Sequence, residues 1–281
     1  MSYPPTRNAS PSTAGEPRMP PPWPSDSVTT SLMETRGVSK SYGAFRALED
    51  VSISVREGEF VSIVGPNGAG KTTLVNLLSG LLVPTKGEIY FKGRNIAGVG
   101  PVALATRGMA RTFQLVQTFP RLTVAETIAA AVVTRQGKRW RLLSPVLEDA
   151  EIASRVAEIA GIFGLSSRLA TLSQLLSQGE KKLLDVASAF ALEPQLILLD
   201  EPTSGVSTAE KHTLMKTLLG AARSASVEAI ILVEHDMDLV ASYSHRIVAL
   251  SEGRVLADLP PEQFFADPVI INTVVGRRRD S

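Results

Sequence analysis

The chain has 281 residues, 44% of them hydrophobic and 5% aromatic, with 29 Lys and Arg against 28 Asp and Glu and no cysteine. The absence of cysteine excludes a disulfide framework and a thiolate zinc site and favours a reducing compartment, for which the cytoplasm is the default. A net charge of +1 disfavours nucleic-acid binding through a basic surface, and the longest uncharged stretch, the 14 residues from Thr72 to Thr85, is shorter than the roughly 18 residues of a membrane-spanning helix.

Residues 1 to about 30 are expected to form a disordered, proline-rich tail. Eight of the 18 prolines lie within the first 24 residues, among Ser, Thr and Gly, where nothing provides an apolar face for a core. We expect a solvated tail, and a docking segment for a proline-recognising partner is the alternative.

Strand patterns begin at Leu32. Residues 38–42 and 51–55 alternate apolar and polar positions with a period of two, which predicts an antiparallel sheet. Phe60–Val64 is a buried-strand pattern that runs into a glycine-rich turn and then a helix over Thr72–Leu78.

A helical region and further strands follow. We expect a helical insert over about 110–185, including a helix that opens at Ser144 and Pro145 and runs to Gly164. Short apolar runs at Leu196–Leu199 and Ala229–Val233 predict strands of a parallel sheet.

The glycine-rich turn carries the most specific motif of the chain. Its glycines permit positive φ and close backbone approach, so that N–H groups and the helix N-terminus converge on phosphate oxygens. Lys71 adds a positive charge at the β- and γ-phosphates, and Thr72 is a predicted Mg²⁺ ligand. A chance glycine-rich turn is the alternative, which the strand before it and the helix after it disfavour. The predicted nucleotide-binding residues are Gly65, Pro66, Asn67, Gly68, Ala69, Gly70, Lys71, Thr72 and Thr73.

Two acidic residues end the predicted strand at 196–199. Asp200 lies at the carboxyl end of this strand, where ligands bind in open α/β sheets, and is a predicted Mg²⁺ ligand. Glu201 is the predicted catalytic residue that accepts a proton from, or orients, the water attacking the γ-phosphate. Two carboxylates that merely end a strand are the alternative.

The stretch from Leu176 to Glu180 predicts a helix start. Ser177 and Glu180 have the spacing of a capping box. Together with the phosphate loop and the Asp-Glu pair, this Leu-Ser-x-Gly-Glu stretch resembles the signature motif of ATP-binding-cassette (ABC) ATPases. The resemblance covers roughly residues 33 to 275 and implies that Ser177, Gln178 and Gly179 bind ATP.

The resemblance implies three more site residues, each unremarkable by itself. Tyr42 matches the aromatic residue that stacks on adenine, and His235 matches the switch histidine, a catalytic residue. Gln114 matches the Q-loop glutamine, which the resemblance implies as a catalytic residue and a Mg²⁺ ligand. Read singly, these are an ordinary strand aromatic, a polar residue near a helix start and a surface loop residue.

The implied fold is α/β, of the ABC type of P-loop NTPase: a parallel-sheet core with an antiparallel β part and the helical insert, all within residues 31–281. Within the family, the chain looks most like the ATPases of branched-chain amino acid importers, and amide or urea importers share the same features. The resemblance lies in three stretches, Arg111–Gln114, Glu234–Met237 and Pro261–Val269. The implied cofactors are ATP and Mg²⁺.

The family resemblance also implies the partners. They are a second ATPase subunit in a head-to-tail dimer, identical or not, and permease subunits contacted through Gln114–Thr123. A solute-binding protein acts indirectly, and no nucleic acid is expected. The chain would then lie peripherally on the cytoplasmic face of the inner (plasma) membrane.

Two departures from the family pattern affect the expected dimer. Gln178 stands where the signature commonly has Gly, and Ser207 stands where the family commonly has Asp. Ser207 and Glu210 predict a capping box that preserves the helix start, although one interface carboxylate is lost.

Competing interpretations remain at this point. One is a soluble ABC ATPase acting on nucleic acid, and another is a non-hydrolysing ATP switch, which Glu201 and His235 disfavour. The basic residues Arg135, Lys138, Arg139 and Arg141 around Trp140, and Arg277–Arg279, are expected to be solvated, with contact to anionic lipid as the alternative.

Overall fold

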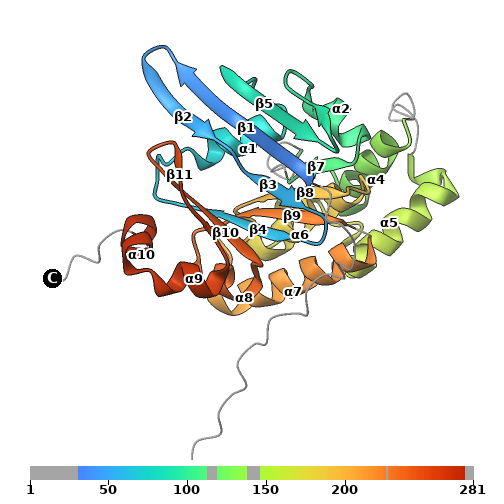
Figure 1. Cartoon of the computed structure of the whole chain (residues 1–281). Coiled ribbons are helices and arrows are strands. Elements are labelled where there is room, and N and C mark those ends of the chain that lie inside the picture. Colours follow the sequence, from blue (N-terminus) through green and yellow to red (C-terminus); the bar gives the residue numbers. More distant parts are fainter. Residues whose placement is uncertain (1–30, 113–118, 138–145, 226, 276–281) are drawn as a thin grey trace, which may run out of the picture.

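The computed structural model of the protein describes residues 31–112, 119–137, 146–225 and 227–275 (Figure 1). The predicted tail lies outside the described residues. So do Gln114, Lys138, Arg139, Trp140, Arg141, Ser144, Pro145 and Arg277–Arg279.

An antiparallel sheet forms one layer, as the period-two pattern predicts. Its spatial order is β2-β1-β5-β6, with β3 paired to another part of β1. The expected strand at 51–55 is instead the junction of β2 and β3, which both pair with β1. The strands are β1 (Ser31–Tyr42), β2 (Phe45–Val51), β3 (Ser54–Arg56), β5 (Lys86–Phe91) and β6 (Arg94–Asn95).

The second sheet has six strands in the order β11-β10-β4-β9-β8-β7. All neighbouring pairs are parallel except β10 with β11. This confirms the parallel core predicted from the short apolar runs. The strands are β4 (Phe60–Val64), β7 (Met109–Arg111), β8 (Leu196–Asp200), β9 (Ala229–Val233), β10 (Arg246–Ser251) and β11 (Arg254–Leu259).

Both faces of the parallel sheet are buried, and side chains alternate between them. In β8, Leu196 and Leu198 pack with α1 (Lys71–Leu78) and the antiparallel sheet, whereas Ile197 and Leu199 face the opposite cluster. A strand buried on both faces needs apolar residues at every position, which explains the uninterrupted apolar runs.

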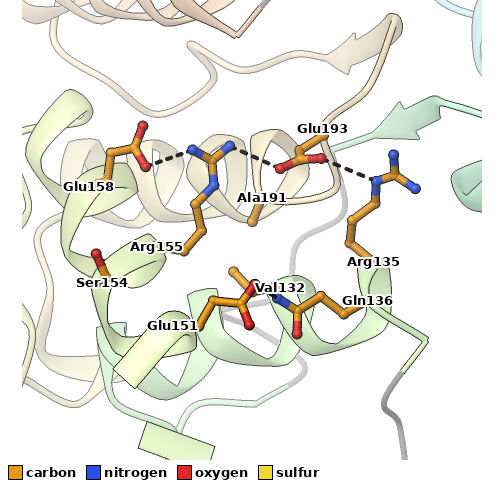
Figure 2. A pocket seen from close by; sticks show the side chains of 9 residues that line it. All are labelled: Val132, Arg135, Gln136, Glu151, Ser154, Arg155, Glu158, Ala191 and Glu193. Carbon is orange, nitrogen blue, oxygen red and sulfur yellow. Dashed lines mark hydrogen bonds and ion pairs between the residues drawn. The ribbon is translucent and has the colours of Figure 1, made fainter. Parts of the chain in front are cut away.

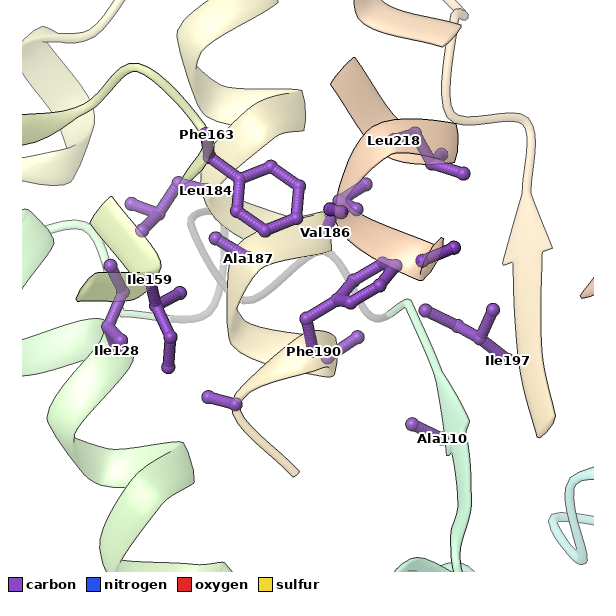
Figure 3. Packing of buried hydrophobic residues seen from close by; sticks show 14 of the residues in the cluster. Ala110, Ile128, Ile159, Phe163, Leu184, Val186, Ala187, Phe190, Ile197 and Leu218 are labelled. Atoms are coloured by element: carbon purple, nitrogen blue, oxygen red, sulfur yellow. The ribbon is translucent and has the colours of Figure 1, made fainter. Parts of the chain in front are cut away.

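Helices cover the face of the parallel sheet turned away from the antiparallel layer (Figure 1). Figure 3 shows the packing of this cluster, in which Phe163 and Phe190 meet edge to face with ring centroids 5.3 Å apart. The helices are α4 (Val124–Arg135), α5 (Ala150–Ile162), α6 (Gln178–Phe190), α7 (Thr208–Ser224) and α8 (Met237–Tyr243). Short helices elsewhere are α2 (Pro101–Thr106), α9 (Pro261–Ala266) and α10 (Pro268–Val275), with 3-10 turns η2 (Val146–Glu148), η3 (Ser166–Arg168) and η4 (Ser173–Leu175).

The helical insert differs in detail from its prediction. Residues 110 and 111 belong to β7, whose backbone pairs with β8, so the insert starts after the sheet rather than at 110. The helix predicted to open at Ser144 instead begins at Ala150, because the Asp149 side chain accepts hydrogen bonds from the N–H groups of Glu151 and Ile152. An acidic N-cap after a 3-10 turn replaces the expected Ser-Pro start.

Candidate functional site

Three loops meet at the carboxyl edge of the parallel sheet. β9 lies between β4 and β8, and Val233 at its end pairs with Ile63 of β4 and with Asp200 of β8. The segments that leave these strands are the phosphate loop, the Asp-Glu pair and the segment containing His235. Strand order therefore brings together residues that are far apart in the sequence.

Two glycines of the phosphate loop are required by the fold itself. Gly65 has φ 149°, and a Cβ there would lie 2.3 Å from the carbonyl oxygen of Leu250. Gly70 has φ 101°, with a Cβ position 2.7 Å from the carbonyl oxygen of Ala47. Gly68 differs, since at φ 82° its Cβ would meet nothing within 4 Å, so the space over this residue is open to a ligand.

This contrast gives a stability prediction. We expect Gly65→Ala to lower the free energy of unfolding by more than the roughly 1–2 kcal/mol of left-handed backbone alone, because a backbone carbonyl must also move. Gly68→Ala should lose only that backbone contribution. Denaturant unfolding of both variants without nucleotide measures the difference. Equal losses would contradict the steric argument.

Lys71 is folded back into the phosphate loop. Its Nζ donates hydrogen bonds to the carbonyl oxygens of Gly65 at 2.7 Å and Pro66 at 3.0 Å, and the residue is only 6% exposed. Burial lowers the pKa of the Lys71 ammonium, while the charges of Glu201 and Asp200 oppose that shift. Lys71 also begins α1, whose first backbone hydrogen bond runs from Leu74 N–H to the Gly70 carbonyl oxygen. The N–H groups of residues 71–73 therefore need acceptors from outside the helix.

A cavity of about 250 Å³ opens over this loop. Its lining joins the phosphate loop to both predicted catalytic side chains that the structure describes. The lining residues are Phe45, Ala47, Asn67, Gly68, Gly70, Lys71, Thr72, Thr73, Glu201 and His235.

The aromatic residue of this cavity is Phe45 and not Tyr42. Tyr42 ends β1, pairs in register with Phe45 across the hairpin, and is 49% exposed with Lys40 Nζ 5.3 Å from its ring centroid. Phe45 is 64% exposed and lines the cavity, which makes it a second candidate for stacking on a base. In the sequence, the position of Phe45 one short turn after Tyr42 was the feature that could have identified it as a second aromatic residue near the site.

Asp200 and Thr72 line a neighbouring cavity of about 420 Å³. Arg111 Nη2 donates to Asp200 Oδ2 at 2.7 Å, and Arg111 Nη1 donates to Asn76 Oδ1 at 2.6 Å. An aspartate carboxylate beside a threonine hydroxyl is an all-oxygen donor set of the kind that Mg²⁺ prefers when phosphates supply the remaining ligands. No group of three or more His, Cys, Asp or Glu capable of holding a metal occurs among the described residues.

Glu201 and His235 contact each other directly. Glu201 Oε1 and His235 Nε2 are 2.7 Å apart, and both side chains are more than 40% exposed. Glu201 has a positive φ of 47°, and its N–H donates to the carbonyl oxygen of Val233 at 3.0 Å. Lys182 Nζ donates to the Glu201 carbonyl oxygen at 3.2 Å. The Glu201 backbone is thus held by two hydrogen bonds, and Glu201 lines the phosphate-loop cavity together with His235.

Ser177 begins α6 through the predicted capping box. Glu180 N–H donates to Ser177 Oγ at 3.2 Å, and Ser177 N–H donates to Glu180 Oε2 at 2.8 Å. That backbone donor is the main cause of a lowered pKa of the Glu180 carboxyl. Ser177, Gln178 and Gly179 line neither cavity described above. The structure therefore does not bring them to the phosphate loop of the same chain.

The capping box predicted at Ser207 is wrong. Ser207 is the N-cap of α7, yet its Oγ donates to the Glu210 carboxylate instead of accepting from the Glu210 N–H. The Glu210 N–H donates to the backbone carbonyl of Ser207 at 2.9 Å. The helix start is kept by this backbone turn.

A larger cavity, of about 540 Å³, lies in the helical insert (Figure 2). Both of its arginines pair with glutamates: Arg155 bonds Glu158 at 2.7 Å and Glu193 at 3.3 Å, and Arg135 lies 3.5 Å from Glu193. Because both cations already have anionic partners, we assign no ligand to this cavity.

Some expectations and findings stand apart from these cavities. The predicted Gln114 is outside the described residues, as is the first half of the expected permease-contact segment, residues 114–118. Motif reasoning assigned no role to Phe45, Arg111 or Lys182, although Arg111 lies in the motif that contains Gln114.

No described helix has the length and apolar character needed to cross a membrane.

Comparisons with known proteins show what the whole chain is similar to. A family model described as ABC transporter matches residues 48–204. The high-affinity branched-chain amino acid transport ATP-binding protein LivG of Salmonella typhimurium is 33% identical over 256 residues, covering 89% of this chain and 99% of LivG. The protein of the same description from Pseudomonas aeruginosa, BraF, is 33% identical over 257 residues, covering 89% of this chain and 99% of BraF.

Solved structures are similar in fold. The ADP conformation of an ATP-binding cassette of an ABC transporter is 27% identical with a TM-score of 0.78, covering 89% of this chain and 100% of that chain. A part of the cbiONQ ABC transporter complex from Clostridium perfringens is 26% identical with a TM-score of 0.73, covering 88% of this chain and 96% of that chain.

Proposed function

Because the chain belongs to the ABC transporter family, as an ATP-hydrolysing, nucleotide-binding subunit, we propose that it powers the uptake of branched-chain amino acids or related small polar solutes. The importer type rests on LivG and BraF, which are described as branched-chain amino acid transport proteins and match nearly over their full lengths. The fold and the family inferred from the motifs are confirmed.

The triphosphate is held by the phosphate loop and α1. Lys71 would exchange its two carbonyl contacts for phosphate oxygens, which suits a buried ammonium better because the new partners carry negative charge. The cavity residues Gly68, Thr72 and Thr73 surround the space where the phosphates fit. Phe45 and Tyr42, at the tip of one hairpin, are the two candidates for contact with the base.

Thr72 and Asp200 are the described residues that would hold Mg²⁺, with Gln114 as a further expected ligand. When bound, the ion neutralises phosphate charge. Arg111 Nη2 already donates to Asp200 Oδ2, so the ion and Arg111 would share this carboxylate.

Glu201 is proposed to accept a proton from, or to orient, the attacking water, and His235 to hold this carboxylate in place. The observation that carries this assignment is their 2.7 Å contact at the rim of the cavity that contains Lys71 and Thr72. A carboxylate within reach of a phosphate site has the geometry that a base requires.

Two copies are proposed to share each ATP. Ser177 caps α6, whose N-terminal N–H groups and partial positive charge favour an anion, yet neither of the two cavities described at the phosphate loop includes this residue. A head-to-tail dimer supplies the missing half of the site. Permease subunits contacted through residues 114–123 would place the protein on the cytoplasmic face of the inner membrane, with a solute-binding protein acting through them.

The function is tested by phosphate release from the purified protein, alone and with vesicles that carry its permease. The proposal predicts ATP hydrolysis that increases when the permease and a loaded solute-binding protein are present. Absence of hydrolysis in both cases would indicate an ATP switch. Hydrolysis that responds to nucleic acid and not to the permease would indicate a soluble ABC ATPase.

The shared site gives a prediction for Ser177→Arg. The variant should bind ATP as a single subunit with a Kd within about twofold of the wild type, since residue 177 serves the other copy. Turnover should fall by roughly a hundredfold, because a bulky cation at the start of α6 prevents the sandwich. Nucleotide titration and phosphate release measure the two effects. An equal loss of monomer binding would contradict the assignment to the partner's ATP.

A further inference from the structure

We propose that Glu234 is a positioning residue that sets the contact between His235 and Glu201 by accepting hydrogen bonds from Thr203. This inference rests on the catalytic roles proposed above for Glu201 and His235, and it assigns a function to a buried carboxylate that those roles do not use.

Glu234 is buried, and the described residues that form hydrogen bonds with its carboxylate all act as donors. It is 4% exposed, and its partner Thr203 is 1% exposed. Thr203 donates to Glu234 Oε1 through its hydroxyl and, at 3.2 Å, through its N–H. His235 N–H donates to Glu234 Oε2 at 3.0 Å. Such a set of donors fits an ionised carboxylate, whose burial would be costly without them.

These bonds close a ring across the two segments that leave β8 and β9. The first link is the backbone bond from Glu201 N–H to Val233 at 3.0 Å. The second is Thr203 to Glu234, and the third is the 2.7 Å contact of Glu201 with His235. The Glu234 side chain joins Thr203 of the first segment to the backbone of His235 in the second, so its removal takes away a buried link beside the exposed His-Glu pair.

A neighbouring ion pair adds support to the same two segments. Lys211 of α7 donates to Asp236 Oδ2 at 2.7 Å, and Asp236 also caps α8. The Asp236 contact is the main cause of a raised pKa of Lys211, and the charge of Glu234 contributes to it. The segment after β8 and the segment of His235 are therefore linked through Glu234, and α7 is linked to the His235 segment through Lys211 and Asp236.

The phosphate loop does not take part in the ring. Its shape depends on the close approach of Gly65 to Leu250 and of Gly70 to Ala47. Loss of the hydrogen bonds between Thr203 and Glu234 should therefore impair turnover and leave ATP binding largely intact.

Steady-state ATP hydrolysis by four variants tests the proposal. Thr203→Val keeps the side-chain shape and removes the hydroxyl donor. Glu234→Gln also keeps the shape, but its amide NH₂ replaces one carboxylate oxygen, so that at least one backbone N–H meets a donor instead of an acceptor. We expect each to lower kcat about tenfold, with KM for ATP within about twofold of the wild type. Thr203→Ser should restore kcat to within about twofold. The Thr203→Val/Glu234→Gln double variant should be no slower than the slower single variant, because both act through one contact.

Thr35→Val is the matched control. Thr35 is equally buried in the antiparallel sheet, where its hydroxyl bonds Val51 at 3.0 Å and accepts from Ile53 at 2.9 Å. It should lower the melting temperature and leave kcat unchanged. Three results would each overturn the positioning role. The first is a fall in kcat that parallels the fall in melting temperature in all variants, the second is an additive loss in the double variant, and the third is wild-type kcat in Thr203→Val.

Glu201→Gln, measured in the same series, separates this inference from the proposed function. Slow turnover in Glu201→Gln together with wild-type turnover in Thr203→Val would overturn the role of Glu234 alone. Wild-type turnover in Glu201→Gln would overturn the catalytic assignment and, with it, this inference.

Discussion

Replacing Lys71 with alanine is expected to reduce ATP hydrolysis by at least about a hundredfold. Lys71 is 6% exposed, and its ammonium is held 2.7 Å from the carbonyl oxygen of Gly65, inside the loop that surrounds the phosphate space. Phosphoryl transfer depends on positioning and on charge stabilisation, and alanine removes a desolvated cation from the point where both are needed.

Phosphate release and ATP titration measure this loss. Lys216→Ala is a suitable control, because Lys216 is an exposed lysine of α7 that lines neither phosphate-loop cavity. The control should hydrolyse ATP at the wild-type rate. Wild-type hydrolysis by Lys71→Ala would refute the role of this lysine.

Replacing Glu201 with glutamine should slow hydrolysis by about a hundredfold or more, the range expected when a general base is lost. Glutamine keeps the shape and can still contact His235 Nε2, which lies 2.7 Å from Glu201 Oε1. ATP binding should persist, since the phosphate loop and Lys71 are unchanged.

Glu252→Gln controls for the backbone effect of this substitution. Glu252 is exposed and has a φ of 49°, close to the 47° of Glu201, yet it lies in the turn between β10 and β11. Its replacement should leave turnover unchanged. Unchanged turnover in both variants would remove Glu201 from the mechanism.

Local sequence motifs were sufficient to predict the elements that surround the phosphate loop. The strand at Phe60–Val64, the turn at Gly65–Gly70 and the helix from Lys71 follow one another directly, so local patterns predict all three. The capping box at Ser177 is also local and is confirmed. The parallel strands were visible because a strand buried on both faces is continuously apolar.

Features that depend on distant contacts could not be predicted in the same way. Arg111 approaches Asp200 only because β7 and β8 pair in parallel. Thr203 and Glu234 meet because β8 and β9 are neighbours in the sheet. Ser207 has capping-box spacing, but its hydroxyl donates to Glu210, and spacing alone does not decide between donor and acceptor.

Sedimentation of the Glu201→Gln protein with and without Mg²⁺-ATP tests the shared ATP site most directly. Slow hydrolysis should trap the closed state, so we expect a dimer with ATP and a monomer without it. Adding Ser177→Arg to the same protein should return it to the monomer while ATP remains bound. A Glu201→Gln protein that binds ATP, does not hydrolyse it and stays monomeric at every ATP concentration would contradict the sandwich of two subunits.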